Sequence, residues 1–299
     1  MTADPQTSPD ARWFRKTPDS STLDRPRLLA RSLLPLPQLD DQIAYYEALL
    51  GVSADLRMPI PDFGGLELAA VGNVLLIASE RAFTPIQRRT SYSLIVPELQ
   101  HQLKRLTALD VAIVEPEERI MPGSRARVRY PDGSLAELVE HRPRPGETAV
   151  RPAERASTNV RLFARHEVRP AHLPNRLTFL QAALETDVSA RWRAGGEAEL
   201  VVIGNMVVVG ASTATTTAEA AGPESVDPHG QARIDFVLLT DSITELRRQA
   251  GAVLVENGAW PGAQRQVWRL PTGAIAEVWH ATPSQLRASE SMPMSESVR

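Results

Sequence analysis

The hydrophobic positions of this chain follow two different periods, and the change of period predicts a mixture of strands and helices. An apolar run at 29–36 has the length of a buried strand, and a helical pattern follows in which Ile43 and Leu50 share one face. Short strands are expected at 66–71 and 74–78, because a Gly-Asn dipeptide between them is typical of a tight turn. The order of these elements indicates a unit of one strand, one helix and three further strands.

The same order of elements recurs between residues 91 and 140. A strand is expected at 91–96, and the helix after it places Leu99, Leu103 and Leu106 on one face. The strands expected to complete this second unit lie near 111–114, 126–130 and 136–140. Two such units in succession predict one module.

The whole pattern is repeated once more, in the same order, in the second half of the chain. Residues 27–31 (RLLAR) recur at 161–165 as RLFAR, and residues 130–137 (YPDGSLAE) recur at 270–277 as LPTGAIAE. The second copy holds an extra segment at 213–231 whose Ala, Thr, Gly and Pro content is typical of a surface loop. A repeat of this length predicts two modules of one kind. We expect a disordered tail at 1–25, module 1 at 26–143, a polar linker at 144–158, module 2 at 159–283 and a second disordered tail at 284–299.

Composition narrows the classes of function. The formal net charge of −3 gives no electrostatic reason to expect nucleic acid or an anionic membrane as a partner. Cysteine is absent, which excludes disulfides, thiolate catalysis and cysteine-ligated metals. Residues 1–22 are polar where a signal peptide needs an apolar run, and no stretch reaches the roughly 20 apolar residues of a membrane span. We therefore expect a cytoplasmic protein.

Two short motifs of the first copy resemble those of a known protein family. Residues 45–51 (YYEALLG) and 131–137 (PDGSLAE) are similar to the FY-x-x-x-LG and PDG-x-x-x-E hallmarks of the vicinal-oxygen-chelate superfamily, which includes glyoxalases and bleomycin-resistance proteins. The resemblance implies an α+β fold with two tandem modules. Each module would contain two βαβββ units that curl into an incomplete barrel around a cleft, which makes four units in all.

The resemblance also implies where a divalent metal would be held in such a module. A ligand would come from the first strand of each unit, and a glutamate from the last strand. The aligned positions are Arg31, Ser91 and Glu137 in the first copy, and Arg165, Ile234 and Glu277 in the second. A guanidinium group has no lone pair to offer a metal, and one carboxylate is not a chelate. We therefore predict that neither module holds a metal or another cofactor.

The arginines at the matching positions have two interpretations. Arg31 should face Glu137 and Arg165 should face Glu277, so each pair could be a buried ion pair that stands where a metal would otherwise join two strands. Alternatively, the arginine is an electropositive anchor for a carboxylate, enolate or phosphate of a bound molecule. Under either interpretation the residues of interest are the same.

The second copy carries more charge on its first strand than the first copy does. Arg165, Glu167 and Arg169 alternate and would project to one face, so we expect a polar cleft in module 2 and an apolar cleft in module 1. A solvent-facing edge strand explains the same charges without a ligand. Trp279 is in phase with Glu277 and would either line that cleft or pack in the core.

The function that these patterns favour is binding of a small organic molecule in a module cleft without a metal. The candidate ligand-binding residues are Arg31, Ser91, Arg165, Glu167, Arg169 and Trp279. The alternative is a lyase, isomerase or cyclase for a carbonyl metabolite, in which Glu137 or Glu277 moves a proton and an arginine stabilises oxyanion charge. The sequence leaves open whether the chain binds or catalyses, whether it is instead a scaffold, and whether it is a monomeric pseudo-dimer or a homodimer.

Overall fold

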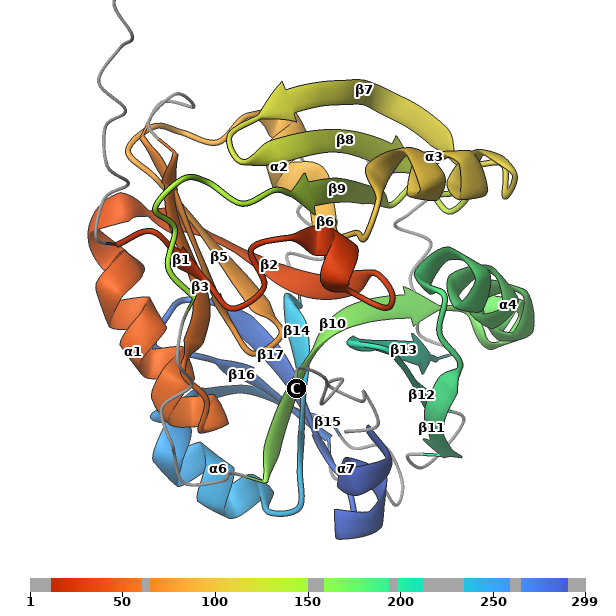
Figure 1. Cartoon of the computed structure of the whole chain (residues 1–299). Helices are drawn as coiled ribbons and strands as arrows, with labels where there is room; N and C mark the ends of the chain where they lie inside the picture. The colour runs from red at the N-terminus through yellow and green to blue at the C-terminus, as the bar shows by residue number, and fades with distance from the viewer. Residues whose placement is uncertain are drawn as a thin grey trace, which may run out of the picture.

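The computed structural model describes residues 12–60, 65–149, 159–193, 198–211, 234–258 and 265–289, and these form two large sheets of nine and eight strands. Figure 1 shows the two sheets one above the other, with the helices around their sides. The first sheet contains residues from the first half of the chain and the second sheet those from the second half. We call the two halves module 1 and module 2.

Module 1 contains two βαβββ units with a short N-terminal strand added at the edge. Its strands are β1 (Phe14–Arg15), β2 (Arg27–Pro35), β3 (Ala54–Ile60), β4 (Leu66–Val71), β5 (Val74–Ser79), β6 (Thr90–Ile95), β7 (Ala112–Ile120), β8 (Gly123–Arg129) and β9 (Leu135–His141), in the order β1-β3-β4-β5-β2-β6-β9-β8-β7. Its helices are η1 (Ser20–Thr22), η2 (Leu36–Gln38), α1 (Leu39–Leu50), α2 (Pro85–Arg89) and α3 (Leu99–Thr107). The first unit is β2-α1-β3-β4-β5 and the second is β6-α3-β7-β8-β9.

Module 2 repeats this plan. Its strands are β10 (Val160–Val168), β11 (Val188–Arg193), β12 (Glu199–Ile203), β13 (Met206–Gly210), β14 (Phe236–Thr240), β15 (Val253–Gly258), β16 (Arg265–Arg269) and β17 (Ile275–His280), in the order β11-β12-β13-β10-β14-β17-β16-β15. Its helices are η4 (Pro170–His172), α4 (Leu173–Leu184), α6 (Ile243–Ala250) and α7 (Pro283–Ser289). The α+β prediction of four βαβββ units in two modules is confirmed.

Strand alternation divides each sheet into two faces that pack differently. Leu28 and Ala30 of β2 belong to one large core together with Leu162 and Ala164 of β10, so this core is shared by both modules. Leu29, between them, belongs to a separate apolar cluster on the opposite face of the first sheet. Because neighbouring side chains of a strand point to opposite faces, each module keeps one concave face that the shared core does not use.

The first strands of the two modules lie side by side near the centre of the molecule (Figure 1). The Nδ2 atom of Asn73 donates a hydrogen bond to the carbonyl oxygen of Leu162, at 3.0 Å. In the equivalent contact, Nδ2 of Asn205 donates to the carbonyl oxygen of Leu28, also at 3.0 Å. The repeated Gly-Asn turns therefore join the modules reciprocally, as a pseudo-two-fold arrangement requires.

Helices of one module pack on helices of the other (Figure 1). The hydroxyl of Tyr45 in α1 donates to the carbonyl oxygen of Ala250 in α6, and Nε2 of Gln102 in α3 donates to the carbonyl oxygen of Ala183 in α4. Both contacts connect a first-unit helix of one module to a second-unit helix of the other. The cross-module pairing is therefore the same at both ends of the interface.

The Pro-Asp-Gly turn of module 1 also takes part in this interface. Asp132 forms an ion pair with Arg176 at 3.0 Å, and its Oδ2 atom lies 3.2 Å from Nε2 of His166; both partners belong to module 2. In module 2 the corresponding Thr272 accepts a hydrogen bond from Gln42 of module 1 through its carbonyl oxygen. The turn that helped to identify the repeat thus serves to join the modules.

The predicted tails are ordered over part of their length. Trp13 is buried, and Arg15 forms a buried ion pair with Glu147 of the predicted linker, with Nε and Oε1 2.5 Å apart. At the other end, Leu286 of α7 is buried in the apolar cluster of module 2. The prediction of disorder is therefore wrong for residues 12–25 and 284–289, because their side chains bury against residues far away in the sequence. The inserted segment 213–231 lies outside the described residues.

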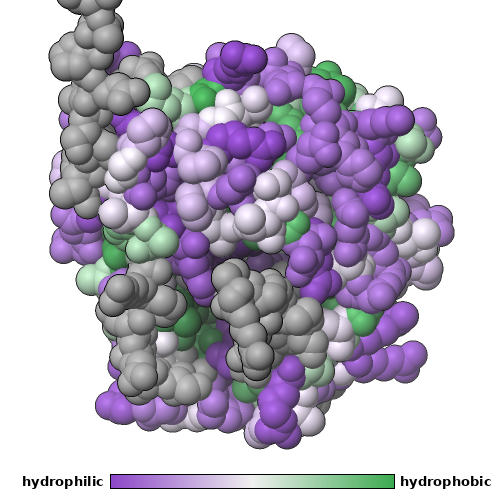
Figure 2. All heavy atoms as spheres, in the orientation of Figure 1, coloured by the Kyte–Doolittle hydropathy of each residue, from purple (hydrophilic) through white to green (hydrophobic). Residues whose placement is uncertain are grey.

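The described residues contain no helix that is long and apolar enough to cross a membrane. On the face shown in Figure 2, hydrophilic residues predominate, and hydrophobic ones are scattered among them.

Asn73→Ala tests the contact between the modules. The substitution removes a donor to Leu162 without changing the turn glycine, so we expect the free energy of unfolding to fall by about 1 kcal/mol. Urea unfolding of the full chain measures the change. Asn159→Ala is the matched control, because Nδ2 of Asn159 bonds the exposed Asp241 within module 2. Equal effects of the two substitutions would contradict a stabilising role for the inter-module bond.

Candidate functional site

The concave face of module 1 encloses a pocket of about 120 Å³. One water molecule needs roughly 10–15 Å³ measured in this way, so the space is large enough for a small organic group. Its walls come mainly from β2 to β6 and are apolar: Leu29, Leu56, Met58, Leu75, Ile77 and Ile95. The lining also includes a small set of charged and polar side chains at one end.

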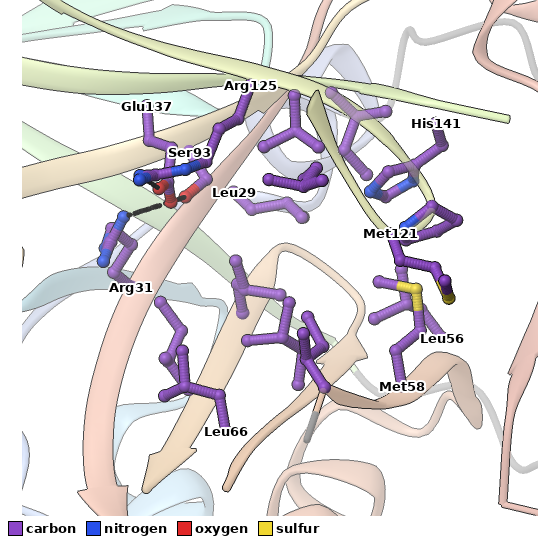
Figure 3. A pocket seen from close by; sticks show the side chains of 18 of the residues that line it. Leu29, Arg31, Leu56, Met58, Leu66, Ser93, Met121, Arg125, Glu137 and His141 are labelled. Carbon is purple, nitrogen blue, oxygen red and sulfur yellow. Dashed lines mark hydrogen bonds and ion pairs between the residues drawn. The ribbon is translucent and has the colours of Figure 1, made fainter. Parts of the chain in front are cut away.

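The charged end of the pocket is built around Glu137, on the last strand of the module (Figure 3). Its Oε2 atom accepts a hydrogen bond from Nη1 of Arg31 at 2.8 Å, and its Oε1 atom accepts one from Nη2 of Arg127 at 3.0 Å. Ser93 lies between the partners, 3.2 Å from Nη1 of Arg31 and 3.4 Å from Oε2 of Glu137. Strands β2, β6, β8 and β9 therefore meet at this carboxylate.

The protonation state of Glu137 follows from this arrangement. Burial alone would raise the pKa of the Glu137 carboxyl, but Arg31, Arg127 and Arg125 outweigh it and hold the pKa below its ordinary value. The group is therefore ionised at neutral pH and accepts hydrogen bonds only. A carboxylate with a lowered pKa is also a weak general base.

Two further carboxylates lie behind the charged end, on the edge strand β7. Nη1 of Arg127 is 2.5 Å from Oε2 of Glu115, and Nη2 of Arg125 is 2.7 Å from Oε2 of Glu118. Neither glutamate lines the pocket. Arg125 and Arg127 therefore connect Glu137 in the pocket to the two glutamates of the edge strand.

His141 lines the pocket away from the charged cluster (Figure 3). Burial lowers the pKa of His141 to about 3, with smaller contributions from Arg15 and Arg27. The imidazole is therefore neutral at physiological pH, and this end of the pocket carries no charge from it.

Module 2 has a corresponding ion-pair cluster. Oε2 of Glu277 is 2.6 Å from Nε of Arg165, and Oε1 is 2.5 Å from Nε of Arg265. Burial would raise the pKa of Glu277, but Arg165 and Arg265 lower it below the ordinary value. The predicted pairs of Arg31 with Glu137 and of Arg165 with Glu277 are thus both present, each within its own module.

The strand registers show which residues occupy equivalent positions in the two concave faces. Leu29 pairs with Ser93, and Phe163 pairs with Val237, so Phe163 stands where module 1 has Leu29. By the same comparison of β8–β9 with β16–β17, Trp279 stands where module 1 has Val139. Two larger side chains therefore fill the concave face of module 2.

The filled face of module 2 corrects one expectation from the sequence. Phe163 and Trp279 belong to an apolar cluster that Leu286 of α7 joins, so large apolar side chains stand beside the ion pairs of Glu277 on the face where a polar cleft was expected. Glu167 is exposed and pairs with Arg165 at 2.7 Å, and Arg169 follows the strand at the start of η4, where it is exposed. Neither takes part in the apolar cluster, and Trp279 is packed in it.

Two of the positions aligned from the sequence need a shift in register. Ser93, and not Ser91, joins Arg31 and Glu137, because the register of β6 with β9 pairs Ser93 with Glu137. In module 2 the equivalent position is Val237, and not Ile234. The register between two strands that are distant in the sequence was not available from residue counting within either strand.

The sequence did not single out the arginines of the strand opposite Glu137. Arg125 and Arg127 both line the pocket, and Arg265 holds the equivalent place to Arg125 in module 2. Arg125 and Arg127 are two positions apart in the strand before the Pro-Asp-Gly turn, and this spacing places both side chains on one face of the sheet. It becomes informative only when the register to Glu137 is known.

The residues at the metal positions of this fold do not fit a divalent metal. Module 1 offers Arg31, Ser93 and Glu137, and Glu137 already accepts hydrogen bonds from guanidinium groups at both oxygens. Within the part of the chain that the structure describes, no three His, Asp or Glu side chains gather in a way that could hold a metal.

Comparison with known proteins identifies similar solved structures. No protein-family model and no curated protein matches the sequence. An uncharacterised protein from Methanosarcina mazei is 32% identical, with a TM-score of 0.34, and the match covers 38% of this chain and 91% of that one. A mutant of 4-hydroxymandelate synthase from Streptomyces coelicolor is 13% identical over 86% of this chain and 93% of that one, with a TM-score of 0.45. An Mn(II)-bound glyoxalase from Novosphingobium aromaticivorans is 10% identical over 88% and 89%, with a TM-score of 0.41.

The arrangement of elements defines the class of protein. Four βαβββ units, paired within two curled sheets, make this a tandem protein of two modules. This is the fold that the repeat and the motifs at 45–51 and 131–137 predicted.

The neutral state of His141 predicts how stability depends on pH. Its folded pKa of about 3 lies below its ordinary value of 6.5, so the unfolded chain binds the proton more readily between these values. The stability that the neutral imidazole contributes is therefore fully present above pH 6.5 and is lost as the pH falls towards 3.

His141→Gln should reduce the slope of unfolding free energy against pH between 6.5 and 4 by up to about 1.4 kcal/mol per pH unit. Urea unfolding at several pH values measures the slope. The exposed His172→Gln serves as the control and should leave the slope of the parent unchanged. An unchanged slope in His141→Gln would mean that the imidazole titrates normally in the folded chain.

Proposed function

We propose that this chain is a metal-independent binding protein for a small organic molecule, which it holds in the module 1 pocket. The observation that carries the proposal is the pocket itself, with apolar walls and a polar cluster confined to one end. Ligand sites in proteins commonly combine a mostly apolar lining with a few polar groups that fix orientation.

Comparison of the two modules supports the proposal that the module 1 pocket binds a ligand. The same sheet architecture is filled in module 2 by Phe163 and Trp279, where module 1 has Leu29 and Val139. The fold therefore does not require a pocket at this place. An unfilled apolar pocket forgoes packing contacts, which costs on the order of a few kcal/mol.

The ion-pair cluster supports binding without a metal. Arg31 occupies the position from which a metal ligand would come, and its guanidinium group already neutralises Glu137. The cluster joins the first and last strands of the module through hydrogen bonds. A divalent cation placed there would meet three guanidinium groups, which repel it.

The same cluster favours binding over proton-transfer catalysis. A general base works best when its pKa lies near the operating pH, whereas the arginines hold the pKa of Glu137 below its ordinary value. Both oxygens of Glu137 also accept hydrogen bonds already. This carboxylate is therefore suited to position arginines rather than to remove a proton from a bound molecule.

The double substitution Leu29→Phe with Val139→Trp tests the site by giving module 1 the residues that fill module 2. We expect this variant to fold, to unfold at a free energy about 1 kcal/mol higher, and to lose binding. The measurement is a thermal-shift screen of a library of small organic acids, amides and amines against parent and variant in parallel.

Compounds that bind in the pocket stabilise the parent and not the filled variant. Val52→Trp adds similar bulk at an exposed position and should retain every hit of the parent. If all stabilising compounds act equally on the parent and on a folded, filled variant, the module 1 pocket is not the binding site.

Metal analysis tests the second part of the proposal. Elemental mass spectrometry of the full chain should find no stoichiometric Zn²⁺, Ni²⁺, Mn²⁺ or Fe²⁺ after incubation with each ion, because the aligned positions lack ligands. Arg31→His combined with Ser93→His is the matched variant, since it adds two imidazoles beside Glu137 and should gain metal. Stoichiometric metal in the parent chain would overturn metal independence.

A further inference from the structure

The pocket of module 1 has an uneven distribution of charge. Among the described residues, its lining includes three guanidinium groups, those of Arg31, Arg125 and Arg127, and one carboxylate, that of Glu137. All four lie on the same side of the pocket, and Figure 3 shows Arg31, Arg125 and Glu137 drawn together there. The opposite side presents Met58, Met121 and neutral side chains.

The carboxylates that balance the remaining arginines lie outside the pocket. Glu115 and Glu118 belong to the edge strand β7, and their side chains are 32% and 54% exposed, whereas that of Arg127 is 2% exposed. Water screens charges on the surface far more than charges in a buried site. A molecule inside the pocket therefore meets an excess of positive charge, even though the cluster as a whole is balanced.

Arg125 is the arginine best placed to bind a ligand. Its side chain is 23% exposed and is divided between Glu118 at 2.7 Å, Glu115 at 3.3 Å and Glu137 at 3.5 Å. The two longer contacts are at or near the limit of a hydrogen bond. A guanidinium group presents donors in a planar fork that matches a carboxylate, so it can form a stronger contact with a ligand than these two provide.

The rest of the lining specifies what is attached to the anionic group. Leu29, Leu75, Ile77 and Ile95 offer only hydrocarbon contacts, so the body of the ligand is apolar. His141 is neutral and provides no negative charge for a cationic group. Of the described lining residues, only Glu137 carries a carboxylate to offset the guanidinium groups for a cation, and it is already paired with Arg31 and Arg127.

We infer that the ligand of the module 1 pocket is a small organic monoanion, a carboxylic acid with a compact apolar body, whose carboxylate is bound by Arg125 at the charged end. The inference rests on the proposed function, since it names the chemical class of molecule that the same pocket binds. Binding involves no covalent step.

Matched ligands that differ only in charge test this inference. The probes are benzoate, phenylacetate and hexanoate, each compared with its primary amide and with the amine of the same carbon skeleton. Ligand-observed NMR and calorimetry on the full chain measure the dissociation constants. We expect at least one acid to bind about tenfold more tightly than its amide, which corresponds to a charge-assisted hydrogen bond, and we expect the amines not to bind.

Arg125→Gln should abolish the preference for the acid and leave binding of the amide unchanged. The variant is expected to fold, because Arg31 and Arg127 still neutralise Glu137. Arg119→Gln is the matched control, since Arg119 is exposed on β7 and does not line the pocket, and it should bind as the parent does.

The outcomes separate the inference from the proposed function. If amides or amines bind in the pocket as tightly as the acids, or if Arg125→Gln keeps the full preference, the inference is wrong and the binding function stands. If no probe of any charge binds the parent, or if binding persists in the filled variant with Leu29→Phe and Val139→Trp, the pocket is not the site and both fail.

Discussion

Burial of one face of each sheet in a core that both modules share is the constraint on which the rest of this structure depends. Leu28 of β2 and Leu162 of β10 belong to the same core, together with residues of α1, α3, α4 and α6. A module on its own would expose this face to water, at a cost of about 25 cal/mol for each Å² of apolar surface. Because alternate side chains of a strand point to opposite faces, the shared core also fixes which residues line the concave face.

The charges on the concave faces follow from the same constraint. Arg31 and Glu137 face each other because β2, β6 and β9 are neighbours in the sheet and the register places Ser93 beside Glu137. Such a buried pair need not add stability, but removing one partner leaves an uncompensated charge. The repeated pair in module 2, Arg165 with Glu277, lies on a concave face that Phe163 and Trp279 occupy. The pair is therefore a feature of the sheet, and the pocket is a separate feature of module 1.

The repeat and its motifs were sufficient to predict the fold and the two ion pairs, because both depend on residue order and strand period. Ser93 was missed in favour of Ser91, since the register of β6 with β9, which are more than forty residues apart, decides which serine lies beside Glu137. The ordered N-terminal segment was missed because Trp13 is buried through contacts that involve residues near 147, more than a hundred positions away. The polarity of the module 2 cleft depended on the volume of Phe163 and not on the charges of its strand. Sequence patterns specify period and register well, and they specify packing between distant segments poorly.

The difference between the two concave faces is more informative than either face alone. Arg31 and Glu137 have counterparts at equivalent positions of module 2, which are Arg165 and Glu277. Both concave faces therefore carry a buried ion pair. The apolar side chains at equivalent positions are smaller in module 1 than in module 2. Module 1 also has one more arginine on this face, because Arg127 stands where module 2 has Val267. Among the described residues, module 1 therefore combines smaller apolar side chains with one more arginine than module 2 has at the equivalent positions. A purely structural ion pair would need neither the extra arginine nor the pocket beside it, and the proposed binding of an apolar anion gives both a use.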